Sequence, residues 1–78
     1  MDTVEELMAM ASSLALQSGA VKVASDISEA IGSKTPTEMR WELTNQDPLF
    51  TYSYADLALQ QAERELNALN LARLKNLQ

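Results

Sequence analysis

Apolar residues recur every three or four positions in the first part of the chain, a spacing that places them on one face of an α-helix. This stripe comprises Val4, Leu7, Met8, Ala11, Leu14 and Ala15. The polar residues Glu5, Glu6, Ser12, Ser13 and Gln17 lie off this stripe, and Gly19 follows where a helix would end. Thr3 and Glu6 have the spacing of a capping box, in which two residues satisfy free backbone groups at a helix start. The pattern predicts an amphipathic helix over residues 4–18.

A similar spacing continues from Ala20 to Ile31 and indicates a second helix before Gly32. Its start is open, because the alternation across residues 21–23 also fits a short strand, and Ser25 would cap a shorter helix. We expect a helix that begins at about residue 20 or 25. Gly32 is then free to adopt the left-handed conformation that commonly follows a helix.

The segment Thr35-Pro36-Thr37-Glu38 has the composition of a helix start and predicts a third helix to Asn45. At 100° per residue, Met39 and Leu43 share one side of this helix. The opposite side carries Thr37, Arg40, Trp41 and Thr44. Burial of Trp41 under the last helix is the favoured reading, because large aromatic side chains dominate small cores. A protein-binding hot spot and a DNA contact are the alternatives.

Residues 45–48 break the helical pattern, and residues 49–52 read as a short extended link. Ser53 and Asp56 have capping-box spacing, and the last helix is expected from about Tyr54 almost to Gln78. The stripe that faces the domain comprises Ala55, Ala58, Leu59, Ala62, Leu66 and Leu69. A further apolar set points in other directions and comprises Leu57, Ala68, Leu71 and Leu74. A helix that is apolar on several sides needs several neighbours, so a second copy or another protein would cover it. The alternative is an ordinary helix with scattered exposed leucines.

The 78 residues contain 11 acidic and 6 basic side chains, a net charge of −5. A chain that neutralises many phosphates should carry a basic patch, so the charge disfavours nucleic-acid binding. Cysteine and histidine are absent, which removes the usual thiolate nucleophile, general base and zinc ligands. We therefore expect no enzyme activity, no cofactor and no metal. The chain lacks a long apolar run and begins with acidic residues, which favours a cytoplasmic protein over a membrane or secreted one.

The order of a long helix, a turn, a helix over residues 25–31, the turn Gly32-Ser33-Lys34 and a helix over residues 35–45 resembles the helix-turn-helix and winged-helix family. The resemblance covers about half the chain. It implies that Thr37, Arg40, Trp41 and Thr44 would face a DNA groove and that Lys34 would reach a phosphate. The acids Glu38 and Glu42 lie on the same helix and would repel the DNA backbone.

The sequence thus predicts one all-α domain over residues 1–78, with about four helices, a helix-turn-helix-like centre and a long C-terminal helix. The leading hypothesis is a non-enzymatic regulatory or adaptor protein that binds another protein, such as an inhibitor encoded by a phage or other mobile element. The candidate partner-binding residues are Thr37, Arg40, Trp41, Thr44, Leu57, Leu71 and Leu74. The alternatives are a DNA-binding regulator that dimerises through the C-terminal helix, and a subunit of a larger assembly.

Overall fold

The computed structural model describes residues 2–77, so Met1 and Gln78 of the expected domain lie outside the described chain. The elements in order are α1 (Thr3–Gln17), α2 (Val21–Ala30), α3 (Pro36–Gln46), a 3₁₀ helix η1 (Pro48–Tyr52) and α4 (Tyr54–Asn76). The described residues contain no strand. The predicted all-α fold with four helices and a long C-terminal helix is confirmed.

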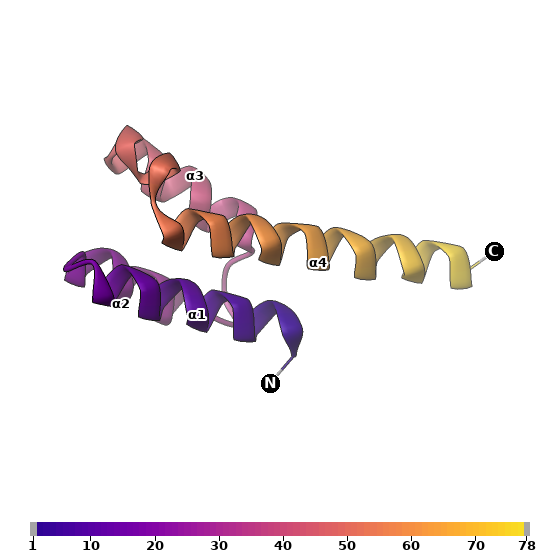
Figure 1. Cartoon of the computed structure of the whole chain (residues 1–78). Helices are drawn as coiled ribbons and strands as arrows, with labels where there is room; N and C mark the ends of the chain where they lie inside the picture. Colours follow the sequence, from indigo (N-terminus) through magenta and orange to yellow (C-terminus); the bar gives the residue numbers. More distant parts are fainter. Residues whose placement is uncertain (1, 78) are drawn as a thin grey trace.

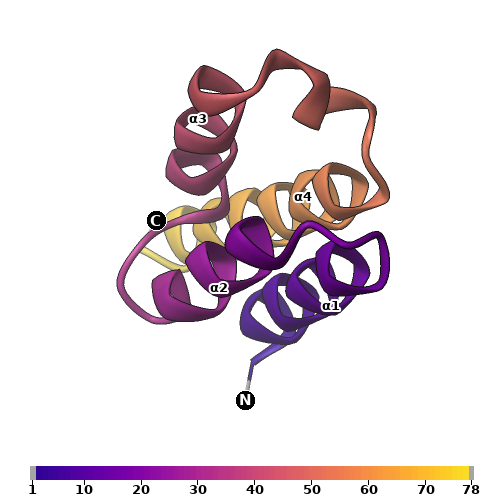
Figure 2. The ribbon, with the colours of Figure 1, turned by 90° about the vertical axis from the view of Figure 1, so that its left-hand side faces the viewer.

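Helices α1 and α4 run side by side in opposite directions and form the most extensive contact of the fold (Figure 1). The view along α4 shows α1 and α2 on one side of it and α3 on the other (Figure 2). Helix α2 packs chiefly on α1 and touches α3 little, although the two follow each other in the chain. The centre of the fold therefore consists of α2 and α3 joined by a turn, with α2 packed chiefly on α1 and α3 packed chiefly on α4.

The helix boundaries follow from local capping. Helix α1 is capped by Asp2, whose carboxylate accepts a hydrogen bond from the Glu5 backbone N–H at 2.8 Å, so the predicted cap at Thr3 was wrong. Gly19 and Gly32 take φ of +86° and +85°, a left-handed region that costs little only for glycine. These two positions end α1 and α2 as the sequence predicted.

Residues 21–23 belong to α2, so the expected helix is confirmed over the strand alternative, and the helical spacing allows Ala24 and Ile27 to be buried on one face. One local expectation differs from the structure. Residues 48–52 form the 3₁₀ helix η1 and not an extended link. The Asp47 carboxylate accepts a hydrogen bond from the Leu49 N–H at 3.0 Å, which starts this turn and buries Phe50.

The core draws residues from α1, α2, α3, η1 and α4 and is rich in alanine. Its buried apolar residues are Val4, Met8, Ala11, Ala15, Ala24, Ile27, Ala30, Met39, Leu43, Phe50, Ala55, Ala58, Leu59 and Ala62. Small side chains at a helix contact allow the helix axes to approach closely. The larger side chains Met8 and Leu59 fill the remaining space, and both are almost fully buried.

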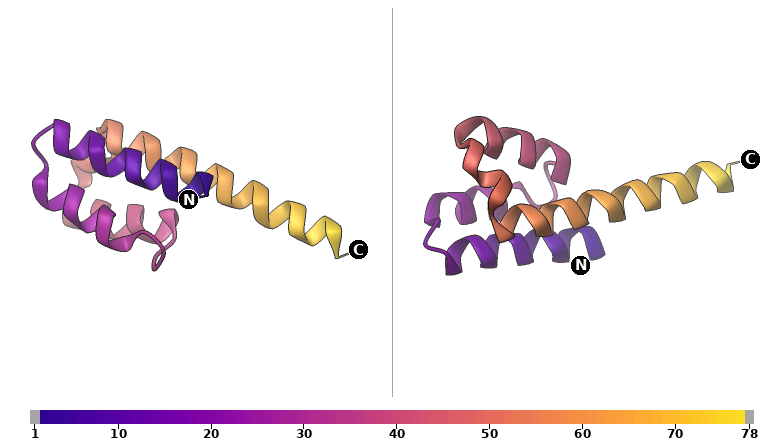
Figure 3. Two further views of the ribbon diagram at one scale, coloured as in Figure 1. Left: turned by 90° about the horizontal axis from the view of Figure 1, so that it is seen from below. Right: turned by 45° about the horizontal axis from the view of Figure 1, so that its top comes forward.

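The C-terminal part of α4 projects beyond the other helices (Figures 1 and 3). Every residue from Asn67 to Leu77 is exposed, and we refer to residues 67–77 as the arm. The molecule measures 46 × 24 × 19 Å, with a radius of gyration of 12.9 Å. A compact domain of this length would have a radius of gyration of about 11.5 Å. The arm accounts for the elongation.

Candidate protein-binding surface

Trp41 lies on the outer side of α3 with 69% of its surface exposed. The expectation that it would be buried under the last helix was wrong. Met39 and Leu43 turn into the core from the same helix, and each lies two positions from Trp41, which is about 200° around the helix. The packing that buries these two residues therefore directs the indole outward.

Arg40 joins α3 to α4. Its guanidinium donates to both carboxylate oxygens of Asp56, at 2.7 and 3.1 Å, and also to the carboxylate of Glu63. The Asp56 hydrogen bonds raise the pKa of Arg40, with a smaller contribution from Glu63. The Arg40 side chain is only 27% exposed, so it does not share the free surface expected for it beside Trp41.

Asp56 is fully buried, yet its charge is well satisfied. Besides the two bonds from Arg40, it accepts one from the Gln60 side-chain amide at 2.8 Å. Its backbone N–H donates to the Ser53 hydroxyl at 3.1 Å, which provides the predicted cap of α4. Among the described residues, no buried side-chain nitrogen or oxygen lacks a hydrogen-bond partner. The buried carboxylate of Asp56 therefore has all its hydrogen-bond partners within the fold.

The other residues that the sequence placed near DNA are Thr37, Thr44 and Lys34, and they differ in their exposure and in the groups they contact. The Thr37 hydroxyl donates to Glu63 at 2.7 Å, and Thr44 is half-buried. The Lys34 ammonium contacts the Glu42 carboxylate at 2.8 and 2.9 Å, and this hydrogen bond raises the pKa of Lys34. Thr37 and Trp41 line one shallow pocket together with Glu38 and Glu42. The structure thus brings together Thr37 and Trp41, while Arg40 and Lys34 are paired with acids.

The leucines expected to face outward on α4 do so. Leu57, Leu71 and Leu74 are each more than half exposed. Leu57 and Leu71 lie on the side of α4 away from α1, and Leu74 lies further along α4 on the same side as Asp56. Leu69 was predicted to face the domain but is 43% exposed, because α1 begins at Thr3 and does not reach that far along α4.

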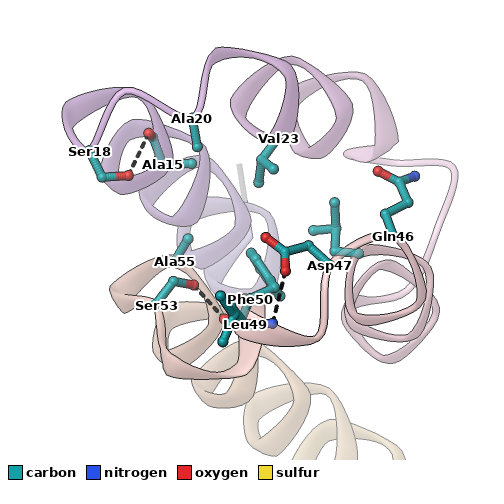
Figure 4. A pocket seen from close by; sticks show the side chains of 11 residues that line it. Ala15, Ser18, Ala20, Val23, Gln46, Asp47, Leu49, Phe50, Ser53 and Ala55 are labelled. Atoms are coloured by element: carbon teal, nitrogen blue, oxygen red, sulfur yellow. Dashed lines mark hydrogen bonds between the residues drawn. The ribbon is translucent and has the colours of Figure 1, made fainter.

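A second apolar region was missed from the sequence. Leu49, Tyr52 and Tyr54 are each at least 70% exposed, around and just after η1. Beside them, a cavity of about 170 Å³ lies between the end of α1, the start of α2 and η1 (Figure 4). Phe50 and Leu49 form part of its lining (Figure 4). The apolar run from Leu49 to Tyr52 was the available signal.

A groove of about 330 Å³ lies where the arm leaves the body. Val4, Met8, Leu66 and Leu69 contribute its apolar lining. Its charged lining comprises the acids Asp2, Glu5 and Glu38 and the cations Lys34 and Arg73. We call this site the basal groove. It combines apolar side chains with charged groups of both signs at the point where the arm leaves the body.

Within residues 2–77, no helix is long and apolar enough to span a membrane. No three acidic, cysteine or histidine side chains in the described chain lie together as a metal site would require. Comparison with models of protein families, with characterised proteins and with solved structures finds no match to this chain. The helix-turn-helix resemblance therefore stays a prediction from the sequence.

Proposed function

We propose that this chain is a non-enzymatic adaptor or regulator that acts by binding another protein through the outer side of α3. The observation that carries the proposal is the exposed Trp41, the largest apolar side chain available in the sequence. Exposed tryptophans are enriched among the few residues that supply most of the binding energy at protein interfaces. A role as an inhibitor encoded by a phage or other mobile element agrees with the small size and acidity.

Helix α3 is held rigidly, which favours binding because little conformational entropy is lost. At its start, Thr35 and Glu38 form a reciprocal capping box. Thr37 in its first turn donates to Glu63 of α4, and Arg40 in its middle donates to Asp56 and Glu63. Trp41 is therefore presented from a preorganised helix.

The surroundings of Trp41 indicate what a partner would offer. The carboxylates of Glu38 and Glu42 line the same shallow pocket as the indole. Glu42 is paired with Lys34 and Glu38 caps the start of α3, so the indole is the group left for a partner, and an apolar pocket would match it. We infer that the partner presents such a pocket, and a basic surface around it would agree with the net charge of −5.

The test compares the wild-type chain with Trp41→Ala and with the control Tyr52→Ala, which removes an exposed aromatic from η1. Each immobilised chain is exposed to extract of the source cells, and a retained protein is purified for affinity measurement. We expect Trp41→Ala to weaken binding by at least about 30-fold, the effect of a hot-spot residue, while Tyr52→Ala binds as the wild type. Equal affinity for the wild type and Trp41→Ala, or no retained protein, would overturn the proposal.

The DNA-binding alternative has less support. Arg40 and Lys34, the two cations expected to approach DNA, are both paired with carboxylates of the same chain. A mobility-shift assay with duplex DNA separates the two hypotheses. An adaptor leaves the duplex unshifted at physiological salt, whereas a DNA-binding regulator gives a shift that weakens steeply as salt rises.

A further inference from the structure

The cavity between α1, α2 and η1 exists because small side chains meet there. Ala15 lies in the last turn of α1, Ala20 caps α2, and Ala55 lies in the first turn of α4. A methyl group at each of these positions leaves a space that a longer side chain would fill. Figure 4 shows the side chains of Ala20 and Val23 directed toward this space.

The cavity has a buried apolar floor and an opening to solvent. Leu43 and Phe50 line it and are buried, at 1% and 7% exposure. Leu49 and Asp47 also line it, and both are exposed, so they lie at the opening. A ligand could therefore enter without unfolding of the helices and place an apolar group against the aromatic ring of Phe50.

The size of the cavity, about 170 Å³, limits what could occupy it. In another protein an apolar cavity of about 150 Å³ stays dry and binds benzene. Drug-sized ligands instead occupy pockets of about 300–1,000 Å³. One six-membered ring therefore fits, and any longer part of a ligand would lie at the opening. Aromatic rings pack favourably against one another, so Phe50 favours an aromatic ring over an aliphatic one.

The hydroxyl groups of the lining are already used within the fold. Ser18 donates to the Ala15 carbonyl at 2.9 Å, and Ser53 donates to the Phe50 carbonyl at 2.7 Å. These two side chains therefore offer no free donor to a ligand. The polar recognition of a ligand would depend on other groups at the opening.

Asp47 supplies the one charge among the described residues that line the cavity. Its Oδ1 accepts a hydrogen bond from the Leu49 N–H at 3.0 Å, and no residue of the described chain donates to its Oδ2. The ion pairs found within residues 2–77 do not include this carboxylate. Figure 4 shows it turned toward the other lining side chains. A cationic group of a ligand would therefore find an available acceptor at the opening.

We propose that this cavity binds a small arylalkylamine, with its aromatic ring inside the cavity and its ammonium group beside Asp47. The net charge of −5 supports a cationic ligand, because a negatively charged chain attracts cations. The inference goes beyond the proposed function and does not depend on it. Trp41 does not line the cavity, so Trp41→Ala should bind the amine as the wild type does.

The test titrates 2-phenylethylamine into the isotope-labelled full chain and follows the backbone amide signals by NMR. We expect saturable shifts centred on Val23 and Phe50, with a dissociation constant of about 1 mM, as suits so small a ligand. Propylamine carries the charge without the ring and should give no saturable shift. Absence of saturable shifts with 2-phenylethylamine would overturn the inference.

Two substitutions that fill the cavity test its position. Ala20→Leu and Val23→Phe should each weaken binding at least tenfold, because the added atoms occupy the space of the ring. Val21→Phe is the matched control, since Val21 is 63% exposed on the same helix and does not line the cavity. Circular dichroism checks that each variant is folded. Binding that both filling substitutions left unchanged would show that the amine binds elsewhere and would refute the assignment.

The role of the carboxylate is tested with Asp47→Asn, which keeps an oxygen to accept from the Leu49 N–H and removes the charge. It should weaken binding of 2-phenylethylamine by about threefold, as expected for an exposed ion pair, and leave binding of ethylbenzene unchanged. Glu29→Gln is the control, because it removes the same charge from an exposed position away from the cavity. Equal effects of Asp47→Asn and Glu29→Gln would refute the contact between Asp47 and the ammonium group.

Discussion

Arg40 and Asp56 are 16 positions apart in the chain, yet the guanidinium donates to both carboxylate oxygens at 2.7 and 3.1 Å. The carboxylate is fully buried, while the Arg40 side chain is 27% exposed. A buried charge of this kind is tolerated only when it is paired and hydrogen-bonded. The pair therefore fixes the position of α3 on α4 and, with it, the direction in which Trp41 faces.

Replacing Arg40 should destabilise the fold strongly. Arg40→Met leaves Asp56 buried without its cation, and loss of one partner from a buried pair typically costs about 3 kcal/mol. Urea unfolding followed by circular dichroism measures the change in the free energy of unfolding. The matched control is Arg64→Met, an exposed arginine of α4, for which we expect a change within about 0.5 kcal/mol.

Removing both charges gives a second measurement on the same pair. Arg40→Met combined with Asp56→Leu should recover most of the lost stability, because apolar groups can replace a buried ion pair at little cost. If Arg40→Met and Arg64→Met had equal effects, the pairing of Arg40 with Asp56 would not be a structural contact in solution.

The cap of α3 should make stability depend on pH. The Thr35 backbone N–H donates to the Glu38 carboxylate at 3.0 Å, and this bond lowers the pKa of Glu38 from its usual 4.5. Because the folded chain favours the ionised form, the carboxylate contributes stability above about pH 4.5. That contribution is lost as the pH falls through the lowered pKa.

Glu38→Gln keeps a hydrogen-bonding side chain but does not titrate. The difference in unfolding free energy between wild type and Glu38→Gln should be largest at neutral pH and shrink in acid, as measured by urea unfolding across the pH range. A difference that stayed constant with pH would contradict the prediction. Thr35→Ala removes the other half of the capping box and should cost about 1 kcal/mol at neutral pH.

Two leucines on α4 should respond differently to the same substitution. Leu59 is fully buried against α1, and truncation of a buried leucine to alanine typically costs about 3 kcal/mol. Leu71 is 56% exposed on the arm, so Leu71→Ala should change stability by less than about 0.5 kcal/mol. Thermal or urea unfolding of the two variants compares these costs. Similar costs would mean that the arm is packed against the body.

Much of the backbone could be predicted because its signals are local. The left-handed glycines, the capping box of Thr35 and the start of α4 after Ser53 each depend on a few neighbouring residues. The apolar spacing of α1 and α4 also identified most of the buried side chains, since a helical face follows directly from the period of 3.6 residues. The cap of α1 was misassigned by one position, because Asp2 and Thr3 are both capable caps.

The surroundings of single side chains were harder to predict. The pairing of Arg40 with Asp56 depends on how α3 docks on α4, which no local pattern encodes. For Trp41 the helical spacing alone predicts an exposed side chain, since Met39 and Leu43 on the inner side place the indole outside. The general preference of aromatic residues for the core was given more weight than this geometry, and the prediction of burial was wrong.

The last fully buried residue of the described chain is Ala62, so the arm contributes nothing to the hydrophobic core. Substitutions beyond that point can change the exposed surface of α4 while the fold is preserved. Natural variants of this chain would be free to diversify their arms while the alanine-rich contact between α1 and α4 stayed constant.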